Sequence, residues 1–99
     1  MKSPTFDSDG YPTTETLNAI TKWEYDEDFK ELIRYVQKAW KWGENYFIVT
    51  ENDDKLEVEV HTGGWSGNEE LIMALKDNTL FYFMCWQDSE GTGRYGFLV

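Results

Sequence analysis

The chain has 99 residues, a formal charge of −10 at pH 7 and an aromatic content of 17%. This length fits one domain, and the aromatic content indicates a folded chain in spite of a mean hydropathy of −0.63. The negative charge argues against direct binding to nucleic acid or to an anionic membrane, because both carry charge of the same sign.

Residues 1–10 are rich in Ser, Asp, Pro and Gly, so we expect a flexible leader ahead of a single domain over residues 11–99. The first element is a short helix after Pro12. Thr13 or Thr14 is expected to be its N-cap, because a hydroxyl there can accept a hydrogen bond from a free helical amide. We expect this helix to end near residue 23.

The clearest periodicity predicts a long helix from about Asp26 to Trp42. Its apolar residues recur at helical spacing and form one stripe: Phe29, Leu32, Ile33, Val36 and Trp40. Acidic residues at its start and lysines near its end match the helix dipole. Gly43 is expected to end the helix in the left-handed conformation.

Two short strands follow as a hairpin. "NYFIVT" (residues 45–50) is β-branched and aromatic, and "KLEVEVH" (residues 55–61) alternates strictly between apolar and polar side chains. The segment "ENDDK" between them supplies the turn. The alternation places Glu57, Glu59 and His61 on a solvent-facing side.

The loop "HTGGWSGNEE" (residues 61–70) leads into a second main helix, "NEELIMALKDN". Ser66 and Glu69 have the spacing of a capping box, in which each side chain accepts from the other residue's amide. Asn78 is expected to end this helix in the left-handed conformation.

The next segment, "TLFYFMCWQ" (residues 79–87), is apolar at both odd and even positions, which predicts a central strand covered on both faces. "RYGFLV" closes the chain as a last strand. The whole order predicts an α+β fold in two layers. We expect a four-stranded, mainly antiparallel sheet with two main helices and the short N-terminal helix on one face.

The glycines and the tryptophan of the loop are left unexplained by the capping box. They form either a structural corner or a ligand-binding loop whose amides hold an anion and whose Trp65 stacks on a ring. The loop lacks the lysine of a phosphate-binding loop, so Arg94 is the candidate cation. The candidate ligand site comprises Thr62, Gly63, Gly64, Trp65, Ser66, Trp86, Arg94 and Tyr95.

The acidic residues concentrate in residues 1–31 and 51–59. Such charge is either a solvated face that keeps the protein soluble or a surface that binds a basic groove on another protein. The candidate partner-binding residues are Glu51, Asp53, Asp54, Glu57 and Glu59.

Enzymatic activity is not expected. His61 is the only histidine, and a general acid–base role would need an orienting partner, for which Glu69 and Glu70 are the candidates. Cys85 lies in the most apolar segment and is interpreted as an inert core thiol. One His and one Cys do not make a zinc site, and the acidic clusters lack calcium-loop spacing, so no metal and no cofactor are predicted.

No apolar stretch approaches the roughly 18 residues that span a bilayer. The polar start of the chain does not read as a signal peptide, and a single cysteine cannot form an internal disulfide. These features predict a cytoplasmic protein.

Several motifs of the chain belong together: "YPTTETL" with Ile20 and Trp23, "HTGGWSGNEELI", Ala74–Leu75, Asn78, Phe81, Cys85–Trp86, Ser89, Gly93, Tyr95 and Phe97. On these motifs the chain, from Tyr11 onward, resembles a family of small bacteriophage and prophage proteins with a TGGWSGNE motif. The resemblance implies a phage origin and a place in the cytoplasm of the infected host, and it implies no catalytic or binding residues. Arg94 departs from the family, which tends to have a second glycine there.

Our leading hypothesis is a non-enzymatic phage protein that counters host defence. In this hypothesis the acidic surface blocks a host nucleic-acid-binding immune protein, such as a CRISPR effector or a restriction enzyme. The alternative is a pocket around the TGGW loop that sequesters a small nucleotide signal. A second alternative is a structural or assembly accessory of the phage, and exposed aromatic side chains could also mark a homo-oligomer face.

Overall fold

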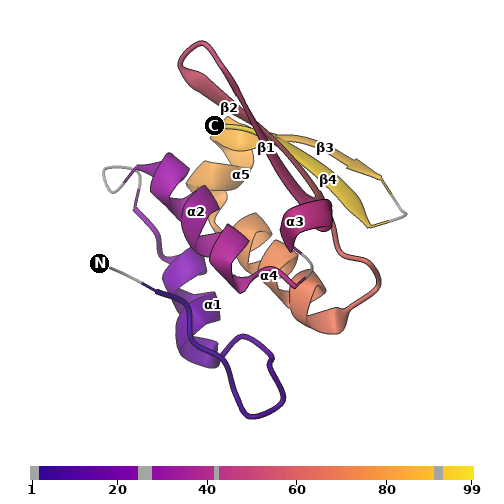
Figure 1. The fold of residues 1–99 in the computed structure, drawn as a ribbon. Coiled ribbons are helices and arrows are strands. Elements are labelled where there is room, and N and C mark those ends of the chain that lie inside the picture. The colour runs from indigo at the N-terminus through magenta and orange to yellow at the C-terminus, as the bar shows by residue number, and fades with distance from the viewer. Residues whose placement is uncertain (1–2, 25–27, 42, 91–92) are drawn as a thin grey trace.

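The chain folds as a four-stranded antiparallel sheet with helices packed against it (Figure 1). This computed structural model describes residues 3–24, 28–41, 43–90 and 93–99. The helices are α1 (Thr14–Thr21), α2 (Phe29–Ala39), α3 (Gly43–Tyr46), α4 (Ser66–Asp77) and α5 (Thr79–Cys85). The strands are β1 (Phe47–Asn52), β2 (Lys55–His61), β3 (Trp86–Glu90) and β4 (Arg94–Leu98). The predicted α+β class is therefore confirmed.

The sheet has the order β1-β2-β4-β3, and all three strand pairs are antiparallel. The predicted hairpin is confirmed as β1 and β2, with Asn52 opposite Lys55 at its turn. The last predicted strand is confirmed as β4, and it pairs with β2 at the centre of the sheet. Pairing of β2 with β4 brings residues that are far apart in the sequence into register, with Glu59 opposite Gly96.

The two faces of the sheet differ in chemistry because successive side chains of a strand point to opposite sides. Leu56, Val58 and Val60 of β2 are buried together with Phe97, which lies opposite Val58 on β4. These side chains meet α2, α4 and α5, which Figure 1 shows on one side of the sheet. The alternate residues form the opposite face, which we call the outer face.

Both early helices form close to the predicted places. Thr13 is the N-cap of α1 and its side chain accepts from the amide of Thr16. Helix α2 is shorter than predicted, and the expected ends Asp26 and Trp42 lie outside the described residues. The predicted apolar stripe of this helix is buried: Phe29, Leu32, Ile33, Val36 and Trp40. Gly43 was expected to end the helix, and this is wrong, because Trp40 is the C-cap and Gly43 begins α3.

The prediction of a central strand over residues 79–87 is wrong. Residues 79–85 form α5, and only Trp86 onward is a strand, β3, at the edge of the sheet. A run that is apolar at both parities lacks the alternation that separates a strand from a helix, so its pattern fits either. Asn78 favours a helix over residues 79–85, because its side chain is the N-cap and accepts a hydrogen bond from the amide of Phe81.

Asn78 was also expected to adopt the left-handed conformation, and this is wrong because its φ is −80°. The residue instead ends α4 and begins α5. Its buried amide nitrogen donates to the carbonyl oxygens of Ile20 and Trp23 at 3.0 Å each. One side chain thereby ties the end of α1 to the junction between two helices.

The residues before α1 fold back on that helix. The amide of Thr5 donates to Oγ1 of Thr16 at 2.8 Å, and the Thr16 hydroxyl donates to the carbonyl oxygen of Thr5. Among the described residues, no helix combines the length and the apolar character that a membrane span requires.

Candidate functional site

The four residues Thr62 to Trp65 form a tight turn between β2 and α4. The amide of Trp65 donates to the carbonyl oxygen of Thr62 at 3.2 Å. Gly63 and Gly64 have φ values of 63° and 78°, the left-handed pattern of a type I′ turn, which glycine adopts without steric cost. Both glycines therefore have a structural reason in the turn itself.

Thr62 is buried and links this turn to β4. Its amide donates to the carbonyl oxygen of Gly93 at 3.0 Å, and its Oγ1 accepts from the amide of Gly64 at 3.4 Å. A side chain at Gly93 would collide with this hydroxyl, and Gly93 has a φ of 86°. The contact fixes the loop against the start of the closing strand.

The predicted capping box at Ser66 is wrong. The N-cap of α4 is Trp65, which makes no side-chain capping bond, and Ser66 is already the first helical residue. The type I′ turn ends at Trp65, so the helix begins one residue earlier than a serine cap allows. The Ser66 hydroxyl donates instead to the phenol oxygen of Tyr11 at 3.2 Å.

Trp65 lies half-buried at the start of α4, against neighbours from two other segments. Its ring centroid is 4.9 Å from that of Tyr11, and Nζ of Lys41 is 4.7 Å from its ring centroid. The ring also covers Gly67, where an added Cβ would overlap it. The glycine at position 67 is thus explained by close packing.

We expect Gly67→Ala to lower the free energy of unfolding by about 1–3 kcal/mol, because the new methyl group displaces the Trp65 ring from Tyr11 and Lys41. In a Trp65→Ala background the same change should be neutral or stabilising, since alanine is the better helix former. Denaturant unfolding of the four proteins in a double-mutant cycle measures the difference. An equal loss in both backgrounds would show that the ring is not the cause.

The remaining ligand candidates lie in a different environment. Trp86 packs against Tyr95 and Phe97, with ring centroids 5.5 and 5.0 Å away, and both rings support the core. Arg94 lies on the outer face of β4, opposite His61 in register. Nucleotide sequestration by these residues together with the loop stays a prediction.

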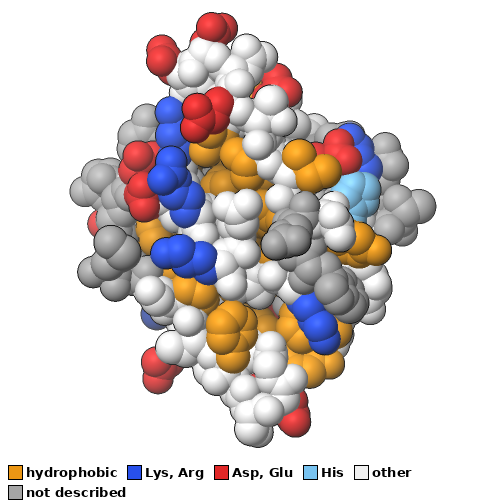
Figure 2. Space-filling view, viewed as in Figure 1, with side chains coloured by type: hydrophobic (Ala, Val, Ile, Leu, Met, Phe, Trp, Pro, Cys, Tyr) orange, Lys and Arg blue, Asp and Glu red, His pale blue; other side chains and the backbone are white. Residues whose placement is uncertain are grey.

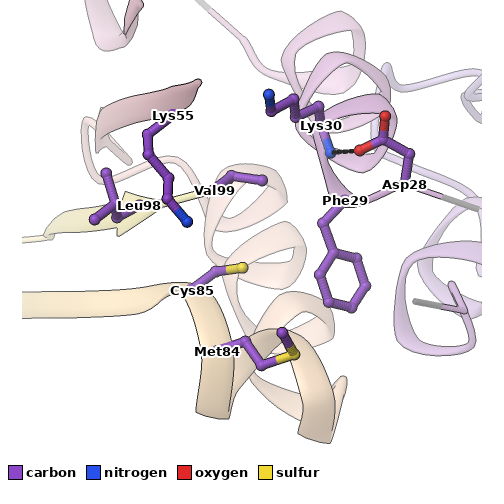
Figure 3. A pocket seen from close by; sticks show the side chains of 8 residues that line it. All are labelled: Asp28, Phe29, Lys30, Lys55, Met84, Cys85, Leu98 and Val99. Carbon is purple, nitrogen blue, oxygen red and sulfur yellow. Dashed lines mark hydrogen bonds between the residues drawn. The ribbon is translucent and has the colours of Figure 1, made fainter. Parts of the chain in front are cut away.

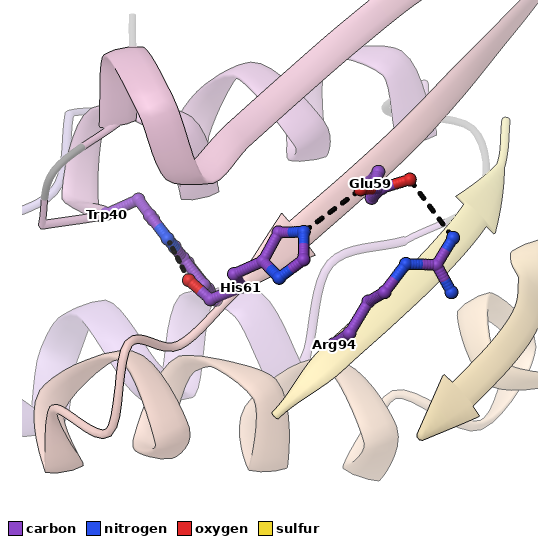
Figure 4. Close-up of polar contacts among 4 residues, drawn as sticks. All are labelled: Trp40, Glu59, His61 and Arg94. Carbon is purple, nitrogen blue, oxygen red and sulfur yellow. Dashed lines mark hydrogen bonds and ion pairs between the residues drawn. The ribbon is translucent and has the colours of Figure 1, made fainter. Parts of the chain in front are cut away.

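The outer face contains a polar cluster of Glu59, His61 and Arg94 (Figure 4). One Glu59 oxygen is 2.9 Å from Nε2 of His61, and the other accepts from Arg94 at 3.0 Å. Figure 4 shows the carboxylate between the side chains of His61 and Arg94. The backbone oxygen of His61 accepts from the Trp40 indole at 3.1 Å. The expectation that Glu69 or Glu70 orients His61 is wrong, because Glu59 occupies that position. Sequence spacing did offer the signal, since residues i and i+2 of a strand share a face.

A shallow hollow of about 360 Å³ lies beside this cluster. It opens where Gly96, opposite Glu59, has no side chain, and Ile48 lies on its rim with 46% of its surface exposed. Part of the outer face is therefore apolar, and part is an internally neutralised charge cluster.

The hydrogen bond from His61, followed by that from Arg94, lowers the pKa of Glu59 below its ordinary 4.5. A carboxylate with a lowered pKa stabilises the fold above the ordinary value, and this contribution is lost as pH falls through the lowered value. We expect His61→Ala to raise the pKa of Glu59 toward 4.5. Carboxyl-detected NMR titration measures it, and an unchanged midpoint would contradict the assigned cause.

The other acidic candidates lie toward the tip of the β1–β2 hairpin. Glu51, Asp53, Asp54 and Glu57 are all exposed, and within the described residues none of their carboxylates forms an ion pair. We call these four residues the acidic hairpin. Figure 2 shows acidic side chains gathered at the end of the molecule where, in Figure 1, this hairpin projects.

Local contacts account for the hairpin's shape and leave its charges exposed. Asp53 has a φ of 57°, which aspartate tolerates better than most residues. Nζ of Lys30 donates to the backbone oxygen of Asp54 at 2.6 Å, and Asn52 donates to Glu57 at 3.3 Å. Neither contact neutralises a carboxylate by an opposite charge.

Cys85 is buried in the core. Burial raises the pKa of the Cys85 thiol to about 11, so it is protonated at neutral pH. In the described ranges, no group of three or more His, Cys, Asp or Glu side chains is arranged to hold a metal ion.

Comparison with family models finds none that matches the chain, and the searches of curated proteins and of solved structures return no match.

Proposed function

We propose that this chain is a non-enzymatic phage protein whose acidic hairpin binds and blocks the nucleic-acid-binding surface of a host immune protein. The observation that supports this most directly is a contrast within the β1–β2 hairpin. The carboxylate of Glu59 is bonded to Arg94 and His61, whereas the four carboxylates of the acidic hairpin are exposed and form no ion pair in the described structure.

Unpaired carboxylates on a projecting hairpin suit a basic groove. Such a groove attracts phosphates, and carboxylates around the tip of a hairpin present the same sign of charge to it. The net charge of −10 adds long-range steering, which raises the rate of association with a basic surface. The phage origin rests on the family resemblance alone. The defence role of the partner is part of this proposal, with a CRISPR effector or a restriction enzyme as the class of target.

The test uses two variants with equal net charge. One neutralises the acidic hairpin: Glu51→Gln, Asp53→Asn, Asp54→Asn and Glu57→Gln. The control neutralises four exposed acids on the helices: Glu15→Gln, Glu31→Gln, Glu70→Gln and Asp77→Asn. Both change the formal charge from −10 to −6, since each removes four carboxylates.

Tagged wild-type protein and both variants are used to capture partners from infected host cells. The proposal predicts that wild-type protein and the helix control retain a nucleic-acid-binding protein and displace its DNA or RNA. The hairpin variant should lose both effects. Retention of the same partner by the hairpin variant would contradict the proposal.

A further inference from the structure

Helix α5 exposes an apolar face. Leu80, Phe83 and Met84 are spaced as i, i+3 and i+4, so they share one side of the helix. Their exposed fractions are 51%, 81% and 51%. Tyr82 flanks them at 42% and contacts Trp86. We call Leu80, Phe83 and Met84 the α5 face.

So much solvent exposure is unusual for a helix with this apolar sequence. The helix "TLFYFMC" contains no charged residue and is apolar on every side. A helix of that kind is normally covered all round. Phe81 and Cys85 turn into the core, and no described residue buries the opposite side of α5.

A hollow lies directly beside the α5 face. Its volume is about 390 Å³, and Figure 3 shows Met84 and Cys85 of α5 at its border with Phe29 of α2 and Leu98 of β4. Met84 belongs both to the exposed face and to the wall of the hollow. A projecting ring, Phe83, and a space for a ring are therefore neighbours on the same surface.

The adjacency of projection and hollow favours one kind of occupant. In a two-fold symmetric contact the same patch is used by both copies, so it must be complementary to itself. A patch with a projecting phenyl ring next to a hollow can be complementary to a second copy of itself.

Charge is compatible with this arrangement. The chain as a whole repels itself at −10, but the α5 face carries no charge. The charged residues around the hollow are Lys30, Lys55 and Asp28, with more positive than negative charge. Lys30 and Lys55 also adjoin the acidic hairpin, since Nζ of Lys30 donates to the backbone oxygen of Asp54.

The apolar area fits the centre of such an interface. With about 200 Å² for a fully exposed large side chain, the exposed parts of Tyr82 and the α5 face amount to roughly 450 Å². Stable interfaces bury about 800 Å² on each partner. Tyr82 and the α5 face thus supply around half of that area, at its centre.

We propose that α5 is a homodimer face, on which a second copy of this chain covers Leu80, Phe83 and Met84 and inserts its Phe83 into the hollow bordered by Phe29, Met84 and Leu98. The acidic hairpin lies at the turn between β1 and β2, next to Lys30 and Lys55 at the border of the hollow. A dimer carries two acidic hairpins.

Sedimentation equilibrium of the full chain tests the proposal over a range of protein concentrations. Wild-type protein should approach twice its mass of 11.7 kDa as concentration rises. Phe83→Asp should remain at the monomer mass, because it places a charge at the centre of the contact. The matched control is Phe6→Asp, at a phenylalanine that is 46% exposed in the N-terminal segment, and it should dimerise as wild type does.

Two results would overturn the proposal: a wild-type chain that stays monomeric at the highest concentration, or a Phe83→Asp variant that still dimerises. Circular dichroism establishes that the variant is folded, and Leu80→Lys provides a second disruption of the same face. Phe83→benzoylphenylalanine tests the insertion itself. Photo-crosslinks between copies should map to the residues of the hollow, and crosslinks confined to other surfaces would contradict it.

Discussion

Replacement of Asn78 by alanine is expected to lower the free energy of unfolding by about 3–5 kcal/mol, because three hydrogen bonds are lost at a buried position. Two of them satisfy the carbonyl oxygens of Ile20 and Trp23, and the third caps α5 at the amide of Phe81. An unsatisfied buried polar group costs about 1–3 kcal/mol. Since a domain of this kind is stable by only about 5–15 kcal/mol, the variant should be close to unfolding.

Denaturant unfolding of Asn78→Ala beside Asn18→Ala measures this effect. Asn18 is an exposed asparagine of α1, so its replacement should change stability by less than about 0.5 kcal/mol. If both variants unfolded at the same denaturant concentration, the assigned role of Asn78 would be wrong.

Asn68→Ala is expected to lower the free energy of unfolding by about 2–4 kcal/mol. The fully buried side chain forms hydrogen bonds with the backbone at Lys41 and Thr62, which share no helix or strand pairing. Its amide nitrogen donates to the carbonyl oxygens of Lys41 and Thr62, both at 3.2 Å. Its carbonyl oxygen accepts from the amide of Lys41 at 3.0 Å. The loop that carries Trp65 is thereby held against the end of α2.

Asn68→Asp separates hydrogen bonding from packing. The shape is kept, but an ionised carboxylate would face the carbonyl oxygens of Lys41 and Thr62. Burial and these oxygens should raise the pKa of the new carboxyl group, so the variant should lose stability relative to wild type as pH rises through that pKa. A stability difference from wild type that is constant between acidic and neutral pH would argue against this.

Much of the fold follows from periodicity alone. The strict alternation of residues 55–61 predicts β2 and its buried side, and the stripe from Phe29 to Trp40 predicts the buried side of α2. In both segments the apolar side chains are the buried ones and most of the polar side chains between them are exposed. The sequence period is clear because one side of each element faces solvent and the other faces the core.

The segment over residues 79–85 shows where periodicity fails. All of its sides are apolar, so neither the two-residue nor the 3.6-residue period is visible. The asparagine before it carried the missing information, since an N-cap at Asn78 begins a helix there. The same uniformly apolar sequence supplies the exposed side chains of the α5 face.

The candidate site could be predicted only in its parts. Exposed acids at a turn are visible in the sequence, but the neutralisation of Glu59 depends on Arg94, which is 35 positions away in the closing strand. Pairing of β2 with β4 decides that contact, and no local pattern encodes strand order. The structural role of Gly63 and Gly64 follows from their positive φ values, which the sequence alone does not show.

The central claim is that local charge on the acidic hairpin, rather than net charge, binds the partner. Isothermal titration of the captured partner with the hairpin-neutralised variant and the helix control, both at −6, tests it most directly. At the upper end of the range of about 0.2–1 kcal/mol per exposed charge pair, the loss of four carboxylates that contact the partner should weaken binding roughly 100- to 1,000-fold in the hairpin variant. The helix control should bind within a few fold of wild type. Equal weakening of both variants, or none in the hairpin variant, would contradict the account.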